Sequence, residues 1–381
     1  MDRDYGLSEE QREIVGLVRE FVAKQVAPQA PGYEERKEFP REAFRRLGEM
    51  GLGGITYSEK YGGGGQPFLT YLAVLEELAA GHIALAVGLS VHHLAAFGLH
   101  EYGSDELKET YLPRLFSGEW LGAYALSEAS SGSDASALRT KAEKVDGGYR
   151  LSGSKRFISH GGEAHLYLVM ARTGEEGPRG ISAFAVEKGW PGFDFGKREE
   201  KMGWHASPMT ELLFDGCDVP GDNLVGDEGQ GFEVALAALD SGRLGMAACA
   251  VGLAQAALDA ALRFTKERSQ FGRSVVEFQG LQFMLADMAT QTEAARRLYR
   301  EAARARDDGH GSSVSCSMAK LFASDVAMRV TTDAVQAHGG YGYMQEYPAE
   351  RYMREAKALQ IVEGTNQVQR MIIGRHLAGP A

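Results

Sequence analysis

Residues 281–299 read LQFMLADMATQTEAARRLY, and the spacing of the apolar and small side chains in this stretch decides the fold class. The positions concerned, separated by steps of 4, 3, 4, 3 and 4, are Leu281, Leu285, Met288, Thr292, Ala295 and Tyr299. Residues three and four apart share one face of a helix, so this spacing predicts a single seam along a long helix. Gly309 and Gly311 are expected to end it.

The segments around this helix predict two more long helices. An Ala-rich run at 235–261 carries the small side chains that allow close helix packing, and a further helix is expected from about 315 to 338. Long helices in succession favour a bundle, so residues 229–381 are predicted to form a C-terminal α-helical domain.

The region between residues 119 and 228 has a different character. Turn-forming pairs such as Asp146-Gly147 and Pro220-Gly221 recur there and separate short runs that are typical of strands. These runs lie at 149–151, 166–170, 182–186 and 211–214. We therefore expect a middle antiparallel β domain, either a barrel or a sandwich.

Residues 1–118 have helical periodicity. Ser8, followed by Glu9 and Glu10, is typical of a helix N-cap with an acidic first turn. Further helices are expected through 72–78 and 85–97. The predicted chain is an α+β multidomain protein, with an all-α N-terminal domain before the β domain and the helical bundle.

The bulk composition narrows the function classes. The 381 residues carry a formal net charge of −11 at pH 7, which disfavours nucleic acid as a partner because phosphate backbones are repelled. The cysteines Cys217, Cys249 and Cys316 lack C-x-x-C spacing, so buried free thiols in a reducing compartment are expected. No apolar run long enough to span a membrane and no signal-peptide core is found, so we expect no membrane span and a cytoplasmic location.

Common catalytic and nucleotide-binding motifs are missing. The sequence contains no G-x-x-x-x-G-K-[ST] loop, no G-x-G-x-x-G between a strand and a helix, and no G-x-S-x-G elbow. It has no H-E-x-x-H and no paired cysteines, so no metal site is expected. The adjacent His92 and His93 face different sides of a helix and are expected to be surface and packing residues.

Three segments could carry chemistry, and each has a plainer alternative. Residues 124–134 (YALSEASSGSD) could hold a heterocycle edge or a pyrophosphate with hydroxyls and N–H groups, or form a flexible surface loop. In 154–162 (SKRFISHGG), an aromatic beside a hydroxyl could cover a flat ring, or the segment could be an ordinary strand and turn. Arg268 in 267–273 (ERSQFGR) suits phosphate recognition, or it complements a helix dipole.

Two more segments lie near the C-terminus. The glycines of 336–343 (QAHGGYGY) allow close backbone approach, or they simply end a helix. In 361–370 (IVEGTNQVQR), Glu363 stands between an apolar run and a glycine, where desolvation raises the pKa and the basicity of a carboxylate. Alternatively, Glu363 is an ordinary loop residue. Thr365 is expected to cap the helix that follows.

In this order and spacing, the motifs resemble the acyl-CoA dehydrogenase family along nearly the whole chain. The resemblance is strongest in YALSEASSGSDA (124–135), ERSQFG (267–272), QAHGGYGYMQEYPAERYMREAK (336–357) and IVEGTNQVQR (361–370), and LDSGRLGMAACAVGLAQAALD (239–259) looks most like short-chain, butyryl-type members. The resemblance implies an FAD cofactor, a C-terminal domain built as a four-helix bundle, and a homotetramer arranged as a dimer of dimers.

The resemblance also implies roles for individual residues. Flavin contacts are implied at Tyr124, Leu126, Ser127, Ser133, Phe157, Ser159, Arg268, Phe271, Gln279, Gln336, Gly339, Gly340, Thr365 and Gln367. Substrate contacts are implied at Ser133, Asp240, Arg243 and Gly364, with residues 240–243 as a pantetheine-binding turn. Arg268 and Gln279 match contacts made from the neighbouring subunit. The family often has Trp where Phe157 stands.

Glu363 matches the catalytic base of the family. One branch carries its base near Gly242, where glycine cannot serve, so Glu363 is the sole candidate here. The resemblance implies oxidation of a saturated acyl-CoA to the trans-2-enoyl-CoA: Glu363 removes the pro-R α-proton and the β-hydride passes to flavin N5. The Glu363 N–H and a ribityl hydroxyl would polarise the thioester carbonyl. Electrons would then pass to an electron-transferring flavoprotein.

Two other functions are considered for this sequence, an acyl-CoA oxidase and a DNA-binding relative. An acyl-CoA oxidase is commonly longer, with an extra C-terminal domain, and a DNA-binding alkylation-response relative needs a basic patch that a charge of −11 disfavours. The length and branching of the acyl group stay open, although short- to medium-chain straight groups are expected. The pocket bottom is expected at helices around 72–94 and 236–239, with Val362 beside the base.

Overall fold

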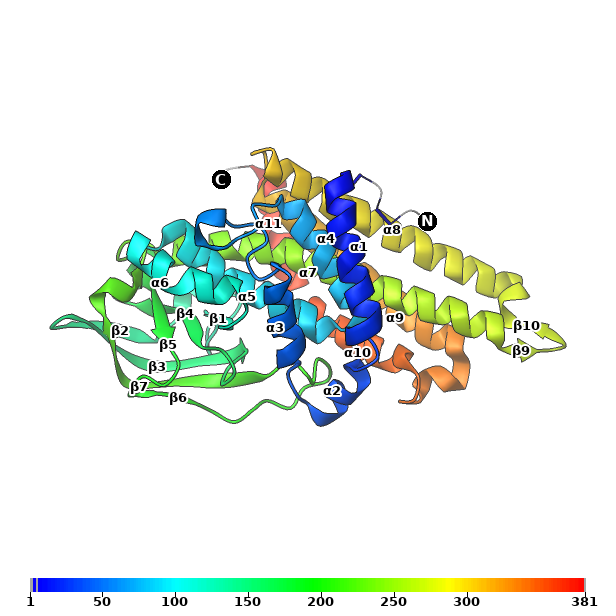
Figure 1. Ribbon diagram of the computed structural model, residues 1–381, viewed down its shortest axis with the longest axis horizontal. Helices are drawn as coiled ribbons and strands as arrows, with labels where there is room; N and C mark the ends of the chain where they lie inside the picture. Colours follow the sequence, from blue (N-terminus) through cyan, green and yellow to red (C-terminus); the bar gives the residue numbers. More distant parts are fainter. Residues whose placement is uncertain (1–2, 5, 380–381) are drawn as a thin grey trace.

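The computed structural model describes residues 3–4 and 6–379, in which helices from both ends of the chain adjoin a β domain (Figure 1). The sheet lies at one end of the long axis, and the small hairpin β9–β10 lies at the other. The predicted order of helices, sheet and helices is confirmed.

The N-terminal region is helical, as expected. Its elements are α1 (Glu9–Phe21), a π-helix (Val22–Val26), α2 (Ala30–Arg36), α3 (Arg41–Glu49), a 3₁₀-helix (Glu59–Tyr61), α4 (Phe68–Gly81), α5 (Ile83–Tyr102) and α6 (Asp105–Phe116). The predicted cap is present: the Ser8 side chain accepts from the Gln11 N–H, and the Gln11 side chain bonds back to the Ser8 N–H. This reciprocal capping box fixes where α1 begins.

The middle domain is one eight-stranded sheet in the order β6-β7-β3-β2-β4-β5-β8, with β1 added beside β4. Its strands are β1 (Gly122–Ala125), β2 (Lys141–Val145), β3 (Gly148–Ser159), β4 (Leu166–Arg172), β5 (Ile181–Glu187), β6 (Phe193–Phe195), β7 (Met209–Pro220) and β8 (Leu224–Val225). Most pairs are antiparallel, as predicted, but β1 runs parallel to β4, and β2 meets β4 in parallel at one residue pair.

The C-terminal region contains the long helices of the bundle. They are α7 (Gly231–Glu267), α8 (Gln279–Asp307), α9 (Ser313–His338), α10 (Pro348–Leu359) and α11 (Asn366–Ala378); β9 (Ser269–Gln270), β10 (Arg273–Ser274) and 3₁₀-helices at Val275–Glu277 and Gly339–Tyr343 connect them. The seam predicted on α8 is buried from Leu285 to Tyr299, and Leu281 at its start is half-buried.

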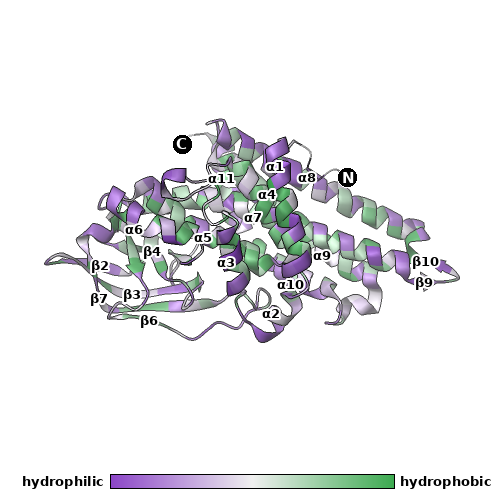
Figure 2. Cartoon of the chain, viewed as in Figure 1, coloured by the Kyte–Doolittle hydropathy of each residue, from purple (hydrophilic) through white to green (hydrophobic). Residues whose placement is uncertain are grey.

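Helix α7 is the centre of the molecule. It packs against α8 and α9 of the bundle and also against α4 and α5 of the N-terminal region. Hydrophobic residues concentrate along α4 and α7 in the middle of the molecule (Figure 2). Contrary to the expectation from the sequence, two helices of the described chain, α5 and α7, are long and apolar enough on average to cross a membrane, but most of each lies inside the protein, as in the core helices of a folded domain. Their apolar character is therefore explained by packing.

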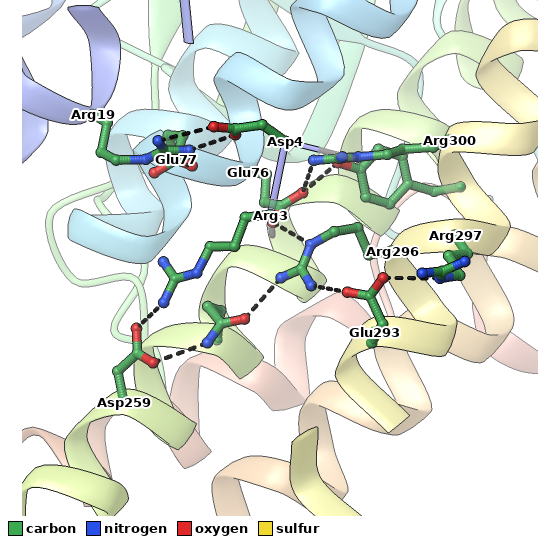
Figure 3. Close-up of polar contacts among 12 residues, drawn as sticks. Arg3, Asp4, Arg19, Glu76, Glu77, Asp259, Glu293, Arg296, Arg297 and Arg300 are labelled. Carbon is green, nitrogen blue, oxygen red and sulfur yellow. Dashed lines mark hydrogen bonds and ion pairs between the residues drawn. The ribbon is translucent and has the colours of Figure 1, made fainter. Parts of the chain in front are cut away.

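A buried ionic network joins α4, α7 and α8 (Figure 3). Glu76 on α4 accepts from Arg296 Nε at 2.8 Å, from Arg300 Nη2 at 3.3 Å and from the Tyr299 hydroxyl. Arg296 also reaches Gln255 on α7 at 2.8 Å. The guanidinium groups hold the pKa of Glu76 below its usual value even though burial alone would raise it.

The three cysteines and the two adjacent histidines all lie in the interior of the protein. The cysteines are free and buried, as predicted. His92 is fully buried and His93 is 5% exposed. The expectation that they are surface residues was therefore wrong, whereas the expectation that they are packing residues is confirmed. Helix α5 is covered on nearly every side, so both histidines face protein.

Candidate active site

Glu363 lies in the loop between α10 and α11, in a strained backbone conformation. Its φ is +54° and that of Gly364 is +89°, both in the left-handed region. For a residue with a side chain this conformation costs about 1–3 kcal/mol and persists only where the surroundings enforce it. Thr365 caps α11, as predicted, by accepting from the Val368 N–H at 3.3 Å.

The Glu363 carboxylate is buried against α7. Its Oε2 has no hydrogen-bond partner among the described residues. A Cβ added at Gly242 would stand 1.9 Å from this oxygen and 3.0 Å from Leu94 Cδ2, so only glycine leaves room for the carboxylate. Burial raises the pKa of Glu363 to about 7, against the opposing effect of Lys320 and Arg243. The group is therefore a much stronger base than an exposed glutamate.

A cavity of about 200 Å³ reaches the same place on α7. It is lined by Thr56, Tyr57, Gln66, Pro67, Phe68, Tyr71, Ser90, His93, Leu94, Phe97, His100, Glu101, Ser241, Gly242, Arg306 and Asp307. Gly242 and Leu94 line this cavity, and a Cβ at Gly242 would contact both Leu94 and the Glu363 carboxylate, so the cavity reaches the part of α7 against which Glu363 lies. Helices α4, α5 and α7 supply the wall, as expected, but Leu236, Leu239 and Val362 are not part of it.

Among the predicted flavin contacts on the β domain, Tyr124 lies close enough to Glu363 for the two groups to interact electrostatically. The Tyr124 hydroxyl donates to Ala235 O on α7 at 3.1 Å, and its pKa is raised by burial and by the Glu363 charge. Leu126 is buried, Ser127 is half-buried and Ser133 is exposed. The hydroxyl-rich segment therefore follows a strand residue that is buried and continues to the surface.

Phe157 on β3 has an unusual backbone conformation. It has a φ of +61° at an irregularity between β3 and β7, and 58% of the residue is exposed. A bulky residue held in the left-handed region with its ring in solvent marks a functional constraint. Ser159, half-buried, follows on the same strand. An open aromatic face beside a hydroxyl fits an isoalloxazine ring.

A second group of predicted flavin contacts lies at the other end of the molecule. Arg268 immediately precedes β9, Phe271 lies in the turn between β9 and β10, and Gln279 begins α8. The Arg268 guanidinium lies 5.4 Å from the ring centre of Tyr341, next to the predicted contacts Gln336, Gly339 and Gly340. These residues share one exposed surface, far from the sheet in Figure 1. One chain therefore does not bring both groups into a single site, whereas Thr365 and Gln367 remain beside Glu363.

The predicted substrate contacts Asp240 and Arg243 lie inside α7, so the helix predicted at 235–261 is confirmed and the separate turn that the resemblance implied at 240–243 is absent from it. The backbone continues as helix because this part of α7 is buried among other helices. Arg243 bonds to Asp240 and, at 2.8 Å, to Ser313 Oγ at the start of α9. Its Nε is buried without a partner in the described part of the chain. This group is suited to hold a polar or anionic ligand arm.

Sequence reasoning missed three residues that surround the base. Lys320 on α9 is buried, and its ammonium donates to Gly364 O and to Asn366 Oδ1, both at 2.9 Å. Gln369 donates to Gly364 O at 2.9 Å. The sequence did contain one indication of a buried cation: Lys320 stands among small and apolar residues in the helix predicted at 315–338.

Comparison with known proteins agrees with this geometry. Three family models match in succession: acyl-CoA dehydrogenase N-terminal domain (8–119), middle domain (123–217) and C-terminal domain (229–378). An acyl-CoA dehydrogenase of Bacillus subtilis is 47% identical over 375 residues, which are 98% of this chain and 99% of the relative.

Two solved structures are similarly close. Butyryl-CoA dehydrogenase from Megasphaera elsdenii has a TM-score of 0.96 and 44% identity, over 99% of this chain and 100% of that one. A chain in a structure described as the electron transferring flavoprotein of Acidaminococcus fermentans has a TM-score of 0.97 and 48% identity, over 99% and 100%. The chain thus belongs to the acyl-CoA dehydrogenase family and is an FAD-dependent oxidoreductase that acts on CH–CH bonds.

Proposed function

We propose that this enzyme oxidises a saturated acyl-CoA to the trans-2-enoyl-CoA, with Glu363 as the base that removes the α-proton. One observation carries the proposal: Glu363 Oε2 is buried with no hydrogen-bond partner among the described residues, and it lies against Gly242, which lines a cavity. A thioester α-proton is weakly acidic, and a carboxylate with a pKa of about 7 is matched to removing it near neutral pH.

The backbone around Glu363 supports the polarisation of the thioester carbonyl. In the part of the chain that the structure describes, the Glu363 N–H donates to no backbone acceptor, so it is free to donate to a substrate oxygen that gains negative charge. Gly364 adds no side chain at this point. When bound, FAD supplies the acceptor for the hydride that leaves the β-carbon.

The remaining roles follow from where the residues lie. Tyr124, Leu126, Ser127, Phe157 and Ser159 would hold the flavin ring end, together with Thr365 and Gln367. Ser133, Asp240 and Arg243 would hold the pantetheine arm. The exposed residues Arg268, Phe271, Gln279, Gln336, Gly339 and Gly340 would contact the FAD of a neighbouring subunit.

We propose a cytoplasmic homotetramer, a dimer of dimers, with domains at 1–118, 119–228 and 229–381. The electron acceptor proposed is an electron-transferring flavoprotein, supported by the similar chain in the Acidaminococcus fermentans structure. Short- to medium-chain straight acyl groups are proposed as substrates, because the butyryl-CoA dehydrogenase is so similar and the cavity beside the base is small.

Replacing Glu363 with Gln tests the proposal. The variant keeps its volume but loses the base, so turnover with acyl-CoA should fall by about 10²–10⁴-fold. The yellow flavin spectrum and acyl-CoA binding should be unchanged. Initial rates on a series of straight acyl-CoAs, with an artificial acceptor, measure turnover and rank chain lengths together. Near-normal activity of Glu363→Gln would refute this assignment.

A further inference from the structure

Lys320 is a buried cation that forms no ion pair with a carboxylate among the described residues. None of the residue is exposed, and its ammonium donates to two neutral oxygens, Gly364 O and Asn366 Oδ1. No ion pair to it occurs within residues 3–4 and 6–379. Burying an ammonium costs several kcal/mol unless a charge or a set of dipoles compensates. Its presence at this position therefore calls for a physical reason.

Both acceptors of Lys320 belong to the turn that carries the base, residues 363–366, which we call the base turn. Gln369 on α11 donates to Glu363 O at 3.3 Å and to Gly364 O at 2.9 Å. Asn366 in turn donates to Ser324 Oγ at 2.9 Å on α9. These bonds occupy the carbonyls of two consecutive left-handed residues and so hold a conformation that is unfavourable by itself.

The charged groups around Glu363 come from several elements. Lys320 on α9 and Arg243 on α7 are the cations that act on its carboxylate, and Lys320 acts more strongly. Tyr71, Tyr124 and Cys249 face it from α4, β1 and α7, but burial raises the pKa of all three, so they stay neutral at pH 7.

Arg243 and Lys320 differ in whether a neighbouring carboxylate already compensates their positive charge. Arg243 already bonds to Asp240, so much of its charge is compensated locally. Lys320 bonds only to neutral oxygens, and the negative charges that act on it are those of Glu363 and Asp325. Asp325 itself pairs with Arg370 at 2.9 Å. Glu363 is therefore the carboxylate left to balance Lys320.

We propose that Lys320 is a positioning residue of the dehydrogenation: its ammonium fixes the base turn and supplies the counter-charge that keeps Glu363 ionised near neutral pH. This inference rests on the proposed function, in which Glu363 is the base. Lys320 acts on the reaction indirectly, through its bonds to the base turn and its charge near Glu363. Position and charge are separable, because a neutral amide can donate the hydrogen bonds without the charge.

The test compares Lys320→Gln, Lys320→Met and Lys320→Arg in the flavin-bound enzyme. Loss of the cation should raise the Glu363 pKa, so the acid limb of the kcat/KM–pH profile should move up by about one pH unit or more in Lys320→Gln. Above that limb, Lys320→Gln should recover most of the wild-type kcat, whereas Lys320→Met should lose kcat at every pH. Lys320→Arg should restore the wild-type limb.

A carbon-13 NMR titration of protein labelled at glutamate measures the Glu363 pKa without relying on enzyme activity. The Glu363 signal is assigned as the one that is missing from the Glu363→Gln spectrum. The control is Arg329→Gln, which removes an exposed cation of the same helix α9 whose guanidinium bonds to Gln291 on α8; its acid limb should stay at the wild-type pH. Should Lys320→Met fail to fold, Lys320→Gln still decides the question of charge. A wild-type acid limb in Lys320→Gln would overturn the proposal, whereas an active Glu363→Gln would overturn the proposed function itself.

Discussion

At the scale of single residues, the base works against the stability of the fold. Burial raises the pKa of Glu363 to about 7 from 4.5, so the folded protein prefers the protonated carboxyl. A carboxyl whose folded pKa lies above its unfolded value destabilises the protein progressively as pH rises between those two values. The same desolvation makes Glu363 a good base, so stability and catalysis are in opposition here.

Glu363→Gln should therefore be more stable than the wild type at pH 8 and equally stable at pH 4.5 or below. The gain should grow between about pH 4.5 and 7 and reach at most ~3 kcal/mol, from 1.36 kcal/mol per pKa unit. Urea unfolding of both proteins at several pH values measures it. The exposed Glu143→Gln serves as the control and should show no such trend. A gain that is the same at all pH values would contradict the desolvation argument.

At the scale of elements, helix α7 shapes the site because it carries a glycine, Gly242, where the Glu363 carboxylate packs against it. Glycine in the interior of a helix is normally a defect that alanine improves by about 0.5–1 kcal/mol. At Gly242 the added methyl would stand 1.9 Å from Glu363 Oε2, so the carboxylate would have to move. The glycine thus defines where the base can lie.

Gly242→Ala should lower kcat by about 100-fold, because displacing a reacting group by about 1 Å has effects of that size. Flavin content should be unchanged. The matched control is Gly16→Ala in α1, where an added Cβ meets nothing within 4 Å; it should keep full activity and gain stability. Steady-state rates and thermal melts distinguish the two. If Gly242→Ala kept wild-type kcat, the contact between α7 and the base would have no catalytic role.

Periodicity predicted the elements better than it predicted their contacts. The seam from Leu285 to Tyr299 could be read from spacing because burial of one helical face imposes it. The parallel pairing of β1 with β4 could not, since a strand of four residues carries no information about its partner. The family resemblance implied a turn at residues 240–243, but these residues continue α7, in agreement with the helix predicted from the Ala-rich run at 235–261. Lys320 was missed because its partners are backbone and amide oxygens that come together only on folding.

At the scale of the whole molecule, the predicted flavin contacts divide into two groups. Tyr124, Phe157 and Ser159 belong to strands β1 and β3 of the sheet, whereas Arg268 and Gln279 adjoin β9 and begin α8. The β9–β10 hairpin lies at the opposite end of the molecule from the sheet (Figure 1). The second group is exposed, and Phe271 there is 93% exposed. A second subunit that brings its hairpin end to the first group would complete the site. Cofactor binding and assembly should then depend on each other.

Arg268→Ala tests this dependence. Removing a charge-assisted contact to a phosphate typically costs about 1.5–3 kcal/mol, so FAD affinity should fall at least ~10-fold. Dilution should then release FAD and dissociate the oligomer together, as measured by flavin fluorescence and light scattering. The neighbouring exposed Glu267→Gln should behave like the wild type. A wild-type protein that stays monomeric while holding one FAD per chain would rule out a shared site. The link between cofactor and assembly would also fail if Arg268→Ala bound FAD normally, because the hairpin would then contribute nothing to the flavin.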